Sequence, residues 1–241
     1  KKAVLAAQKL VNQDKVFIVA GHLGTPQNMA AMPGQFEKGV ANGWVCWAFS
    51  NHDVVRHVSR WARPGEDTDA IAKFAITLLA SLRGSICLYQ GEELGLTEAE
   101  IAYEDLRDPY GIRFWPGFKG RDGCRTPMVW DVEKPNAGFS TGMPWLPVPE
   151  EHRKRAADAQ WGEPNSVLSR YRAVLALRKG HAALVSGSIA FLEGEDDVLA
   201  FFREANAEKL ICVFNFSQEG RRWMLPPGVL VFDEFQFPEQ N

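Results

Sequence analysis

The sequence lacks the features that mark several protein classes. Four cysteines occur among 241 residues, and they form neither a CxxC pair nor a metal-type spacing. No run of eighteen apolar residues is present, and the opening Lys1 and Lys2 are not followed by a signal peptide's apolar core. The formal net charge is −3, and the longest basic run is residues 153–155. We therefore expect no membrane or nucleic-acid partner, and a cytoplasmic protein with reduced, mostly buried cysteines, among which Cys124 is the most exposed.

The composition that remains is that of a globular protein with a substantial core. Hydrophobic residues make up 46% and charged residues 24% of the chain. This length allows one large domain, or a large domain followed by a small one. The phosphate-binding motifs GxGxxG and GxxxxGK[ST] are absent, which disfavours a doubly wound nucleotide-binding fold.

Short apolar runs alternate with helical patterns in the first part of the chain. The runs that we expect to form buried strands cover residues 16–20, 44–49 and 85–89, and helical patterns cover 1–13, 26–40 and 69–82. Two of these strands end in polar clusters that contain carboxylates, at residues 50–53 and 90–93. This alternation of strands and helices predicts an α/β fold. Because the active sites of (β/α) barrels lie at the carboxyl ends of their parallel strands, we expect a site at that end.

The remainder of the chain has two parts with different sequence patterns. Residues 91–165 lose regular periodicity and are rich in Pro, Gly and Trp, which indicates a loop excursion over a site. A helix is predicted over 166–178, with Asn165 or Ser166 as its N-cap and Gly180 after its end. Short β-type runs follow at residues 188–192, 198–203, 210–216 and 228–232. We therefore predict a barrel part over 1–180 and a small antiparallel β domain over 181–241.

Three motifs, in this order and spacing, resemble the α-amylase family of glycoside hydrolases (family 13). They are residues 49–53 (FSNHD), 88–95 (LYQGEELG) and 120–128 (GRDGCRTPM), the last followed by Trp130. The second and third are similar to the α-glucosidase and oligo-1,6-glucosidase branch. The similarity runs from about Gly43 to Lys179, and residues 1–42 yield no alignment. It implies the C-terminal part of a (β/α)8 TIM barrel followed by a small antiparallel β domain.

The resemblance also implies roles for individual residues. Glycoside hydrolysis passes through an oxocarbenium-like transition state and normally uses two carboxylates that flank the scissile bond. In the family, the Asp of the NHD motif is a third carboxylate, which binds the 2- and 3-hydroxyls of the sugar being cleaved. This catalytic role falls to Asp53, and His52 would bind the same hydroxyls. Arg121 would close the pocket floor near the 4-hydroxyl, with its acidic partner expected outside this chain.

Other residues near these motifs have two interpretations each. Asn51, Arg56 and Glu92 would support the site from behind, although a plain salt bridge explains Arg56 equally well. Glu92 or Glu93 is also a candidate for the acid of the reaction. Arg125 is expected to tie its loop down by hydrogen bonds.

The aromatic residues of the loop excursion, Phe114, Trp115 and Trp130, either form its mini-core or stack on an acceptor sugar. No organic cofactor is implied, and no metal ligands are predicted. The ligands of any structural Ca or Mg ion of the family would lie outside this chain.

The chain departs from the family pattern in its first fifty residues. Nothing in residues 1–50 resembles the nucleophile motif, and Glu37 is the only glutamate before Glu66. The sequence therefore predicts a portion of a retaining α-glucosidase, acting on an oligosaccharide or disaccharide with the missing N-terminal barrel half as partner. Two alternatives remain open: a sucrose isomerase or transglucosidase of the same branch, and a non-catalytic carbohydrate-binding or interaction protein.

Overall fold

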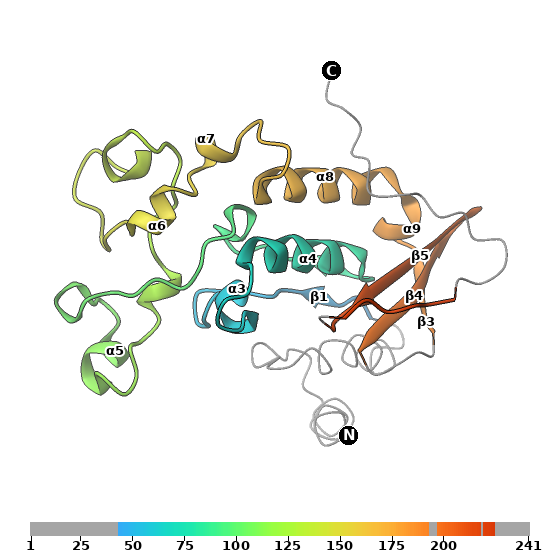
Figure 1. The fold of residues 1–241 in the computed structure, drawn as a ribbon, viewed down its shortest axis with the longest axis horizontal. Helices are drawn as coiled ribbons and strands as arrows, with labels where there is room; N and C mark the ends of the chain where they lie inside the picture. The colour runs from blue at the N-terminus through green and yellow to red at the C-terminus, as the bar shows by residue number, and fades with distance from the viewer. Residues whose placement is uncertain (1–42, 193–196, 218, 225–241) are drawn as a thin grey trace.

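The computed structural model describes residues 43–192, 197–217 and 219–224, and Figure 1 shows their arrangement. The predicted helices over 1–13 and 26–40 and the predicted strands over 16–20 and 228–232 lie outside the described residues.

A parallel strand pair forms the barrel-like part of the described structure. β1 (Cys46–Trp47) pairs with β2 (Ser85–Ile86), with Cys46 opposite Ser85. The chain between them forms helices α3 (His57–Trp61) and α4 (Thr68–Ser81), so the unit is the expected βαβ crossover. The two strands are shorter than the predicted runs because each has ladder partners only where the other lies alongside. The described residues contain these two parallel strands and no closed barrel.

Two long helices lie side by side beside this strand pair (Figure 1). α4 begins where the Asp67 side chain accepts a hydrogen bond from the Asp69 amide at 2.9 Å. α8 (Val167–Gly180) begins at Ser166, whose hydroxyl accepts from the Ser169 amide at 3.0 Å. Both predicted helices are thus confirmed to within two residues. The helices share a core of aliphatic side chains and one tyrosine: Val58, Ala72, Ile76, Ala80, Val167, Tyr171 and Val174.

The end of α8 differs from the expectation. Gly180 is the last helical residue, and the C-cap is His181, whose φ of −118° is ordinary extended backbone. The helix therefore ends without a left-handed glycine, and it leads directly into the short helix α9 (Ala182–Val185).

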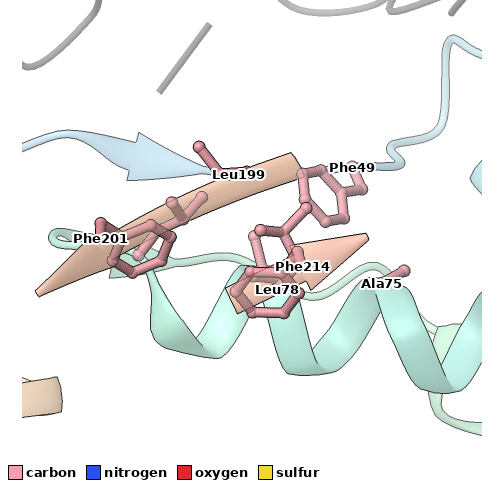
Figure 2. Close-up of a cluster of buried hydrophobic side chains, with 8 residues drawn as sticks. Phe49, Ala75, Leu78, Leu199, Phe201 and Phe214 are labelled. Carbon is pink, nitrogen blue, oxygen red and sulfur yellow. The ribbon is translucent and has the colours of Figure 1, made fainter. Parts of the chain in front are cut away.

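An antiparallel sheet packs against one end of the helices. Its strands are β3 (Ser188–Phe191), β4 (Val198–Ala205) and β5 (Glu208–Asn215), in the order β3-β4-β5. Side chains from β4 and β5 meet those of α4 and of the chain after β1 in one buried cluster, as Figure 2 shows: Phe49, Ala75, Leu78, Leu199, Phe201 and Phe214. The sheet and the strand–helix unit therefore share one core, and the division at residue 180 stays a prediction.

Residues 91–165 lie at the opposite end of the molecule from the sheet (Figure 1). Their elements are short, namely η1 (Glu92–Leu94), η2 (Tyr103–Asp105), α5 (Pro109–Phe114), η3 (Asp122–Cys124), η4 (Pro135–Gly138), α6 (Glu150–Arg153) and α7 (Ala157–Gln160). Two small buried clusters stabilise this region, one around Leu94 and Val129 and one of Ile101, Leu106 and Leu146. The predicted loop excursion is thus a packed, largely irregular layer.

The expectation for the cysteines is wrong in detail. Cys124 is buried, and its thiol donates to the Arg121 carbonyl at 3.1 Å, whereas Cys46 and Cys87 are exposed. Burial raises the pKa of the Cys124 thiol to about 11. Among the described residues, no helix is both long and apolar enough to cross a membrane.

Candidate functional site

The loop after β1 presents two polar side chains to solvent. The Asn51 side chain accepts a hydrogen bond from the Asp53 amide at 2.8 Å, which is the local turn that asparagine favours. Behind this turn, the Ser50 hydroxyl accepts from the His57 amide at 2.9 Å and anchors the loop to the start of α3. His52 and Asp53, at the tip, are therefore exposed. The Asn51 side chain thus shapes the turn that carries them, and its supporting role at the site stays a prediction.

Two arginines hold the Asp53 carboxylate. Arg121 Nη1 donates to Asp53 Oδ1 at 2.8 Å, and Arg125 Nη2 donates to the same oxygen at 3.0 Å. The other oxygen, Oδ2, lies 3.3 Å from His52 Nε2. The hydrogen bond from Arg121, helped by the positive charges of Arg121 and Arg125, lowers the pKa of Asp53 below its usual value. Asp53 is therefore a carboxylate at neutral pH.

A second carboxylate fixes Arg121 from below. Arg121 Nε donates to Asp108 Oδ2 at 2.8 Å and Nη2 donates to Asp108 Oδ1 at 3.1 Å, a bidentate pair. The Asp108 side chain is fully buried, and the Arg121 hydrogen bond lowers its pKa to about 2. Arg121 therefore has two acidic partners within this chain, Asp108 and Asp53, which the sequence did not predict. The further acidic partner outside this chain stays a prediction.

The backbone around Arg121 is shaped for this pair. Gly120 has a φ of +80°, and a Cβ there would lie 2.8 Å from the Cα of Gly111 and 3.0 Å from Asp108 Oδ2. Only glycine therefore fits between α5 and the arginine. Asp122 Oδ2 accepts from the amides of Arg107 and Asp108, at 2.6 and 2.8 Å, and ties the two segments together.

Arg125 connects the third motif to the first. Its Nε donates to the His52 carbonyl at 2.7 Å, so the prediction that Arg125 ties its loop down is confirmed. Its bond to Asp53 was not foreseen, because a sequence does not say which of two nearby arginines reaches a given carboxylate.

His52, Arg121 and Arg125 border an open cavity of about 620 Å³. Asp53 is not among the lining residues, but it pairs with all three of these. Its polar lining consists of His52, Tyr89, Gln90, Arg121, Arg125 and Thr126. Its apolar lining consists of Pro127, Met128, Phe139 and Trp145. The loops that follow β1 and β2 thus meet at one site, as expected for the carboxyl ends of neighbouring parallel strands.

Arg56 lies behind the cavity wall. It is buried, and its Nη1 donates to the Gln90 carbonyl at 2.8 Å while its guanidinium lies 5.2 Å from the centre of the Tyr89 ring. Gln90 and Tyr89 both line the cavity. Arg56 therefore supports that wall through a backbone carbonyl and an aromatic ring.

Glu92 also lies behind the wall. Only 2% of it is exposed, and its Oε1 is 3.7 Å from His57 Nδ1. Burial raises the pKa of Glu92 to about 8 and lowers that of His57 to about 3. The pair is therefore mostly uncharged at neutral pH. Neither Glu92 nor Glu93 lines the cavity, and Glu93 Oε2 accepts from the Gly91 amide at 2.8 Å, an arrangement that does not favour either as the acid.

The three aromatic residues that were candidates for sugar stacking lie outside the cavity lining. Phe114, Trp115 and Trp130 are exposed, and none of them lines the cavity. Trp115 packs beside Tyr103, with 5.6 Å between ring centres. Phe139 and Trp145, which no motif singled out, line the cavity together with Tyr89 of the second motif. The described residues also contain no group of three His, Cys, Asp or Glu side chains placed to hold a metal ion.

A family model for the catalytic domain of alpha-amylase matches residues 14–187. The match begins well before Gly43, so the expectation that residues 1–42 resemble nothing is wrong for most of that segment. A probable alpha-glucosidase of Rhizobium meliloti (strain 1021) is 55% identical over 202 residues, which cover 84% of this chain and 36% of that protein. An oligo-1,6-glucosidase of Parageobacillus thermoglucosidasius is 33% identical, over 78% of this chain and 37% of that enzyme. The chain thus spans little more than a third of these relatives.

Solved structures resemble the chain over most of its length. The alpha-glucosyl transfer enzyme XgtA has a TM-score of 0.80 at 45% identity, covering 94% of this chain and 43% of its own. The isomaltulose synthase of Erwinia rhapontici NX5 has a TM-score of 0.70 at 30% identity, covering 81% of this chain and 38% of its own.

Proposed function

Because the chain belongs to the alpha-amylase family, we propose that it is a portion of a retaining α-glucosidase that releases terminal α-linked glucose from short oligosaccharides or disaccharides. One observation carries this proposal: the Asp53 carboxylate, kept ionised by Arg121 and Arg125, pairs with these two arginines and with His52, and all three line a cavity between two strand ends. The identity of 55% to a probable alpha-glucosidase supports it.

In this proposal, Asp53 binds sugar hydroxyls more tightly as the reaction proceeds. Both arginines donate to Oδ1, so Oδ2, beside His52, is the oxygen left to accept a sugar hydroxyl. Positive charge develops on the sugar ring in the transition state, and a fixed carboxylate stabilises that charge more than the neutral ground state. Arg121, held by Asp108, gives the pocket a closed floor. The nucleophile and the general acid/base would come from the part of the relatives that this chain does not span.

Sugar binding by the 241-residue chain tests this role. We would titrate it with glucose and with 1-deoxynojirimycin, a sugar-like amine whose positive charge imitates the transition state. Asp53→Asn should weaken binding of the amine by about tenfold or more, because the attraction between the carboxylate and the positive charge of the ligand is lost. It should weaken binding of glucose, which carries no charge, less. Asp105→Asn, which changes a carboxylate that is bonded to neither Arg121 nor Arg125, is the matched control. Equal affinity of Asp53→Asn for the amine, or no sugar binding by the unaltered chain, contradicts the proposal.

Hydrolysis of a chromogenic α-glucoside tests whether the nucleophile and the general acid/base lie outside this chain. The chain should bind the glucoside without cleaving it. Turnover that disappears in Asp53→Asn would show that the nucleophile and acid lie within these residues.

A glucosyl-transferring or sucrose-isomerising enzyme is the second candidate. The TM-score of 0.80 with an alpha-glucosyl transfer enzyme favours it. A related isomaltulose synthase was solved with its natural substrate sucrose, at 29% identity to this chain. Product analysis on sucrose by the catalytically complete enzyme separates the two, because hydrolysis yields glucose and fructose whereas isomerisation yields a new disaccharide. Sugar binding without turnover even in the complete enzyme would favour a non-catalytic carbohydrate-binding protein.

A further inference from the structure

We propose that Phe139 and Trp145 form a stacking platform for the second sugar ring, the one beyond the bond to be cleaved. This inference rests on the proposed function. Of the large apolar side chains that are exposed in the described structure, these two line the cavity, with 44% and 51% of each residue exposed. Exposed aromatic rings that border a polar site offer a surface to a ligand with an apolar face.

The backbone that carries Phe139 is held in an unusual conformation. Asn136 and Ala137 have φ angles of 51° and 52°, in the left-handed region that residues other than glycine rarely adopt. The Ala137 carbonyl accepts from the Trp130 and Asp131 amides at 2.8 and 3.1 Å, and Ala137 is fully buried. Such strain persists only where the surroundings determine the conformation, and it is found often at binding sites.

Side-chain hydrogen bonds close the same loop. Asn136 Nδ2 donates to the carbonyls of Ser140 and Gly142, at 2.9 and 2.8 Å. Phe139 lies between these contacts. Its ring is therefore presented by a preformed loop, which reduces the entropy lost when a ligand binds.

Trp145 is anchored through its backbone rather than its ring. Arg107 Nε donates to the Trp145 carbonyl at 3.2 Å, and the next residue, Leu146, is buried with Ile101 and Leu106. The Arg107 amide donates to Asp122, beside the Asp108–Arg121 pair. The same segment thus connects the aromatic lining to the pocket floor.

The polar and the aromatic residues of the cavity lining suit two different sugar rings. His52, Arg121 and Arg125 offer hydrogen bonds and charge, which suit the hydroxyls of the sugar bound at Asp53. Phe139 and Trp145 offer flat apolar faces, which suit the C–H face of a second sugar ring. The cavity of about 620 Å³ falls within the usual range for small-molecule sites, roughly 300–1,000 Å³, which also accommodates a disaccharide. A single glucose bound at Asp53 would leave the platform uncovered.

The test compares one-ring and two-ring ligands on the 241-residue chain. Affinities for glucose, maltose and isomaltose are measured by calorimetry for the unaltered chain, Phe139→Ala and Trp145→Ala. Each variant should weaken at least one disaccharide by about three- to tenfold, as expected for one aromatic contact, and should change glucose affinity less than about twofold. Trp145→Phe keeps a ring and should recover much of the loss, whereas Phe139→Leu keeps apolar volume without a ring and should not.

Two exposed aromatic residues outside the cavity lining serve as matched controls. Phe114→Ala and Trp161→Ala remove rings from residues that are 51% and 64% exposed, and both should bind disaccharides normally. Unchanged disaccharide affinity in the platform variants overturns this inference while glucose binding, and with it the proposed function, stands. An equal loss for glucose and disaccharides also overturns it, because that result indicates a general role in folding the pocket. Absence of any sugar binding by the unaltered chain refutes the proposed function and the platform together.

Discussion

Arginines stabilise both ends of this molecule, but with different partners. At the sheet end, Arg203 is completely buried and donates to the carbonyls of Ser81, Leu184 and Gly187, at 2.5 to 3.1 Å. At the cavity end, Arg121 donates to two carboxylates, and 30% of its side chain is exposed. A cation bound to backbone carbonyls fixes the chain, whereas one bound to carboxylates in contact with solvent leaves charge available to a ligand.

Three of the carbonyls that arginines bind at the sheet end belong to the end of α4. Helix ends leave carbonyl groups without intrahelical partners. Arg178, from α8, donates to the carbonyls of Ala80 and Leu82 at 2.5 and 3.0 Å. Arg203, from β4, donates to the carbonyl of Ser81. Two arginines from distant parts of the chain thus complete one helix end and join it to the sheet.

Arg203→Leu should have the largest effect on stability. The change leaves several buried carbonyls without a donor, and we expect the free energy of unfolding to fall by about 3–5 kcal/mol. Thermal or urea melts followed by circular dichroism measure this. Arg113→Leu, on the exposed side of α5, should cost less than about 0.5 kcal/mol. Equal losses in the two variants would remove the distinction between the ends.

The buried pair of Glu92 and His57 differs from both ends, because it is mostly uncharged at neutral pH. The folded-state pKa of Glu92 is raised to about 8, so the folded chain holds a proton that the unfolded chain releases above about pH 4.5. Stability attributable to Glu92 therefore falls as the pH rises from about 4.5 to 8. The pKa of His57 is lowered to about 3, so stability attributable to it falls as the pH drops from about 6.5 toward 3.

Glu92→Gln should make the free energy of unfolding depend less on pH above about pH 5. The variant cannot lose a proton, so between pH 5 and 8 it should lose about 2–4 kcal/mol less stability than the unaltered chain. Urea melts at a series of pH values provide the measurement. Parallel pH profiles for the two proteins would show that Glu92 ionises freely in the folded chain, in conflict with its burial.

Asp108→Asn should have a smaller effect, because Arg121 keeps Asp53 as a partner. The pKa of Asp108 is lowered to about 2, so its carboxylate stabilises the fold above pH 4 and loses that contribution as the pH falls toward 2. We expect the variant to lose about 2 kcal/mol at pH 7 and the difference from the unaltered chain to shrink at pH 2–3. A constant difference across this range in acid melts would argue against an ionised Asp108.

The sequence predicts the parts of this structure that depend on local signals. The helices over 69–82 and 166–178 were predicted correctly because an apolar face and a capping side chain lie within each segment. The predicted strands over 44–49 and 85–89 are mostly irregular, because strand extent depends on partners remote in sequence.

The residues of the candidate site also fall into those that local sequence identifies and those that only the folded structure shows. His52, Asp53 and Arg121 were identified from their motifs, and the structure brings them together. Asp108 was missed because it pairs with Arg121 across an irregular segment, although an aspartate before Pro109 was a signal for a helix N-cap. Phe139 belongs to no motif, and only the folded loop shows that it lines the cavity.

Asp53→Asn should have the smallest effect on stability and the clearest effect on function. Its carboxylate is half exposed and pairs with arginines that retain other partners, Asp108 for Arg121 and the His52 carbonyl for Arg125. Exposed ion pairs contribute little to stability, so the Tm should stay within the scatter of replicate melts. Binding of 1-deoxynojirimycin should nevertheless weaken, because the ligand loses the carboxylate that faces its positive charge. A large drop in Tm would place Asp53 with Arg203 among the residues that hold the fold, and the contrast between the two ends would then fail at the residue on which the proposed function depends.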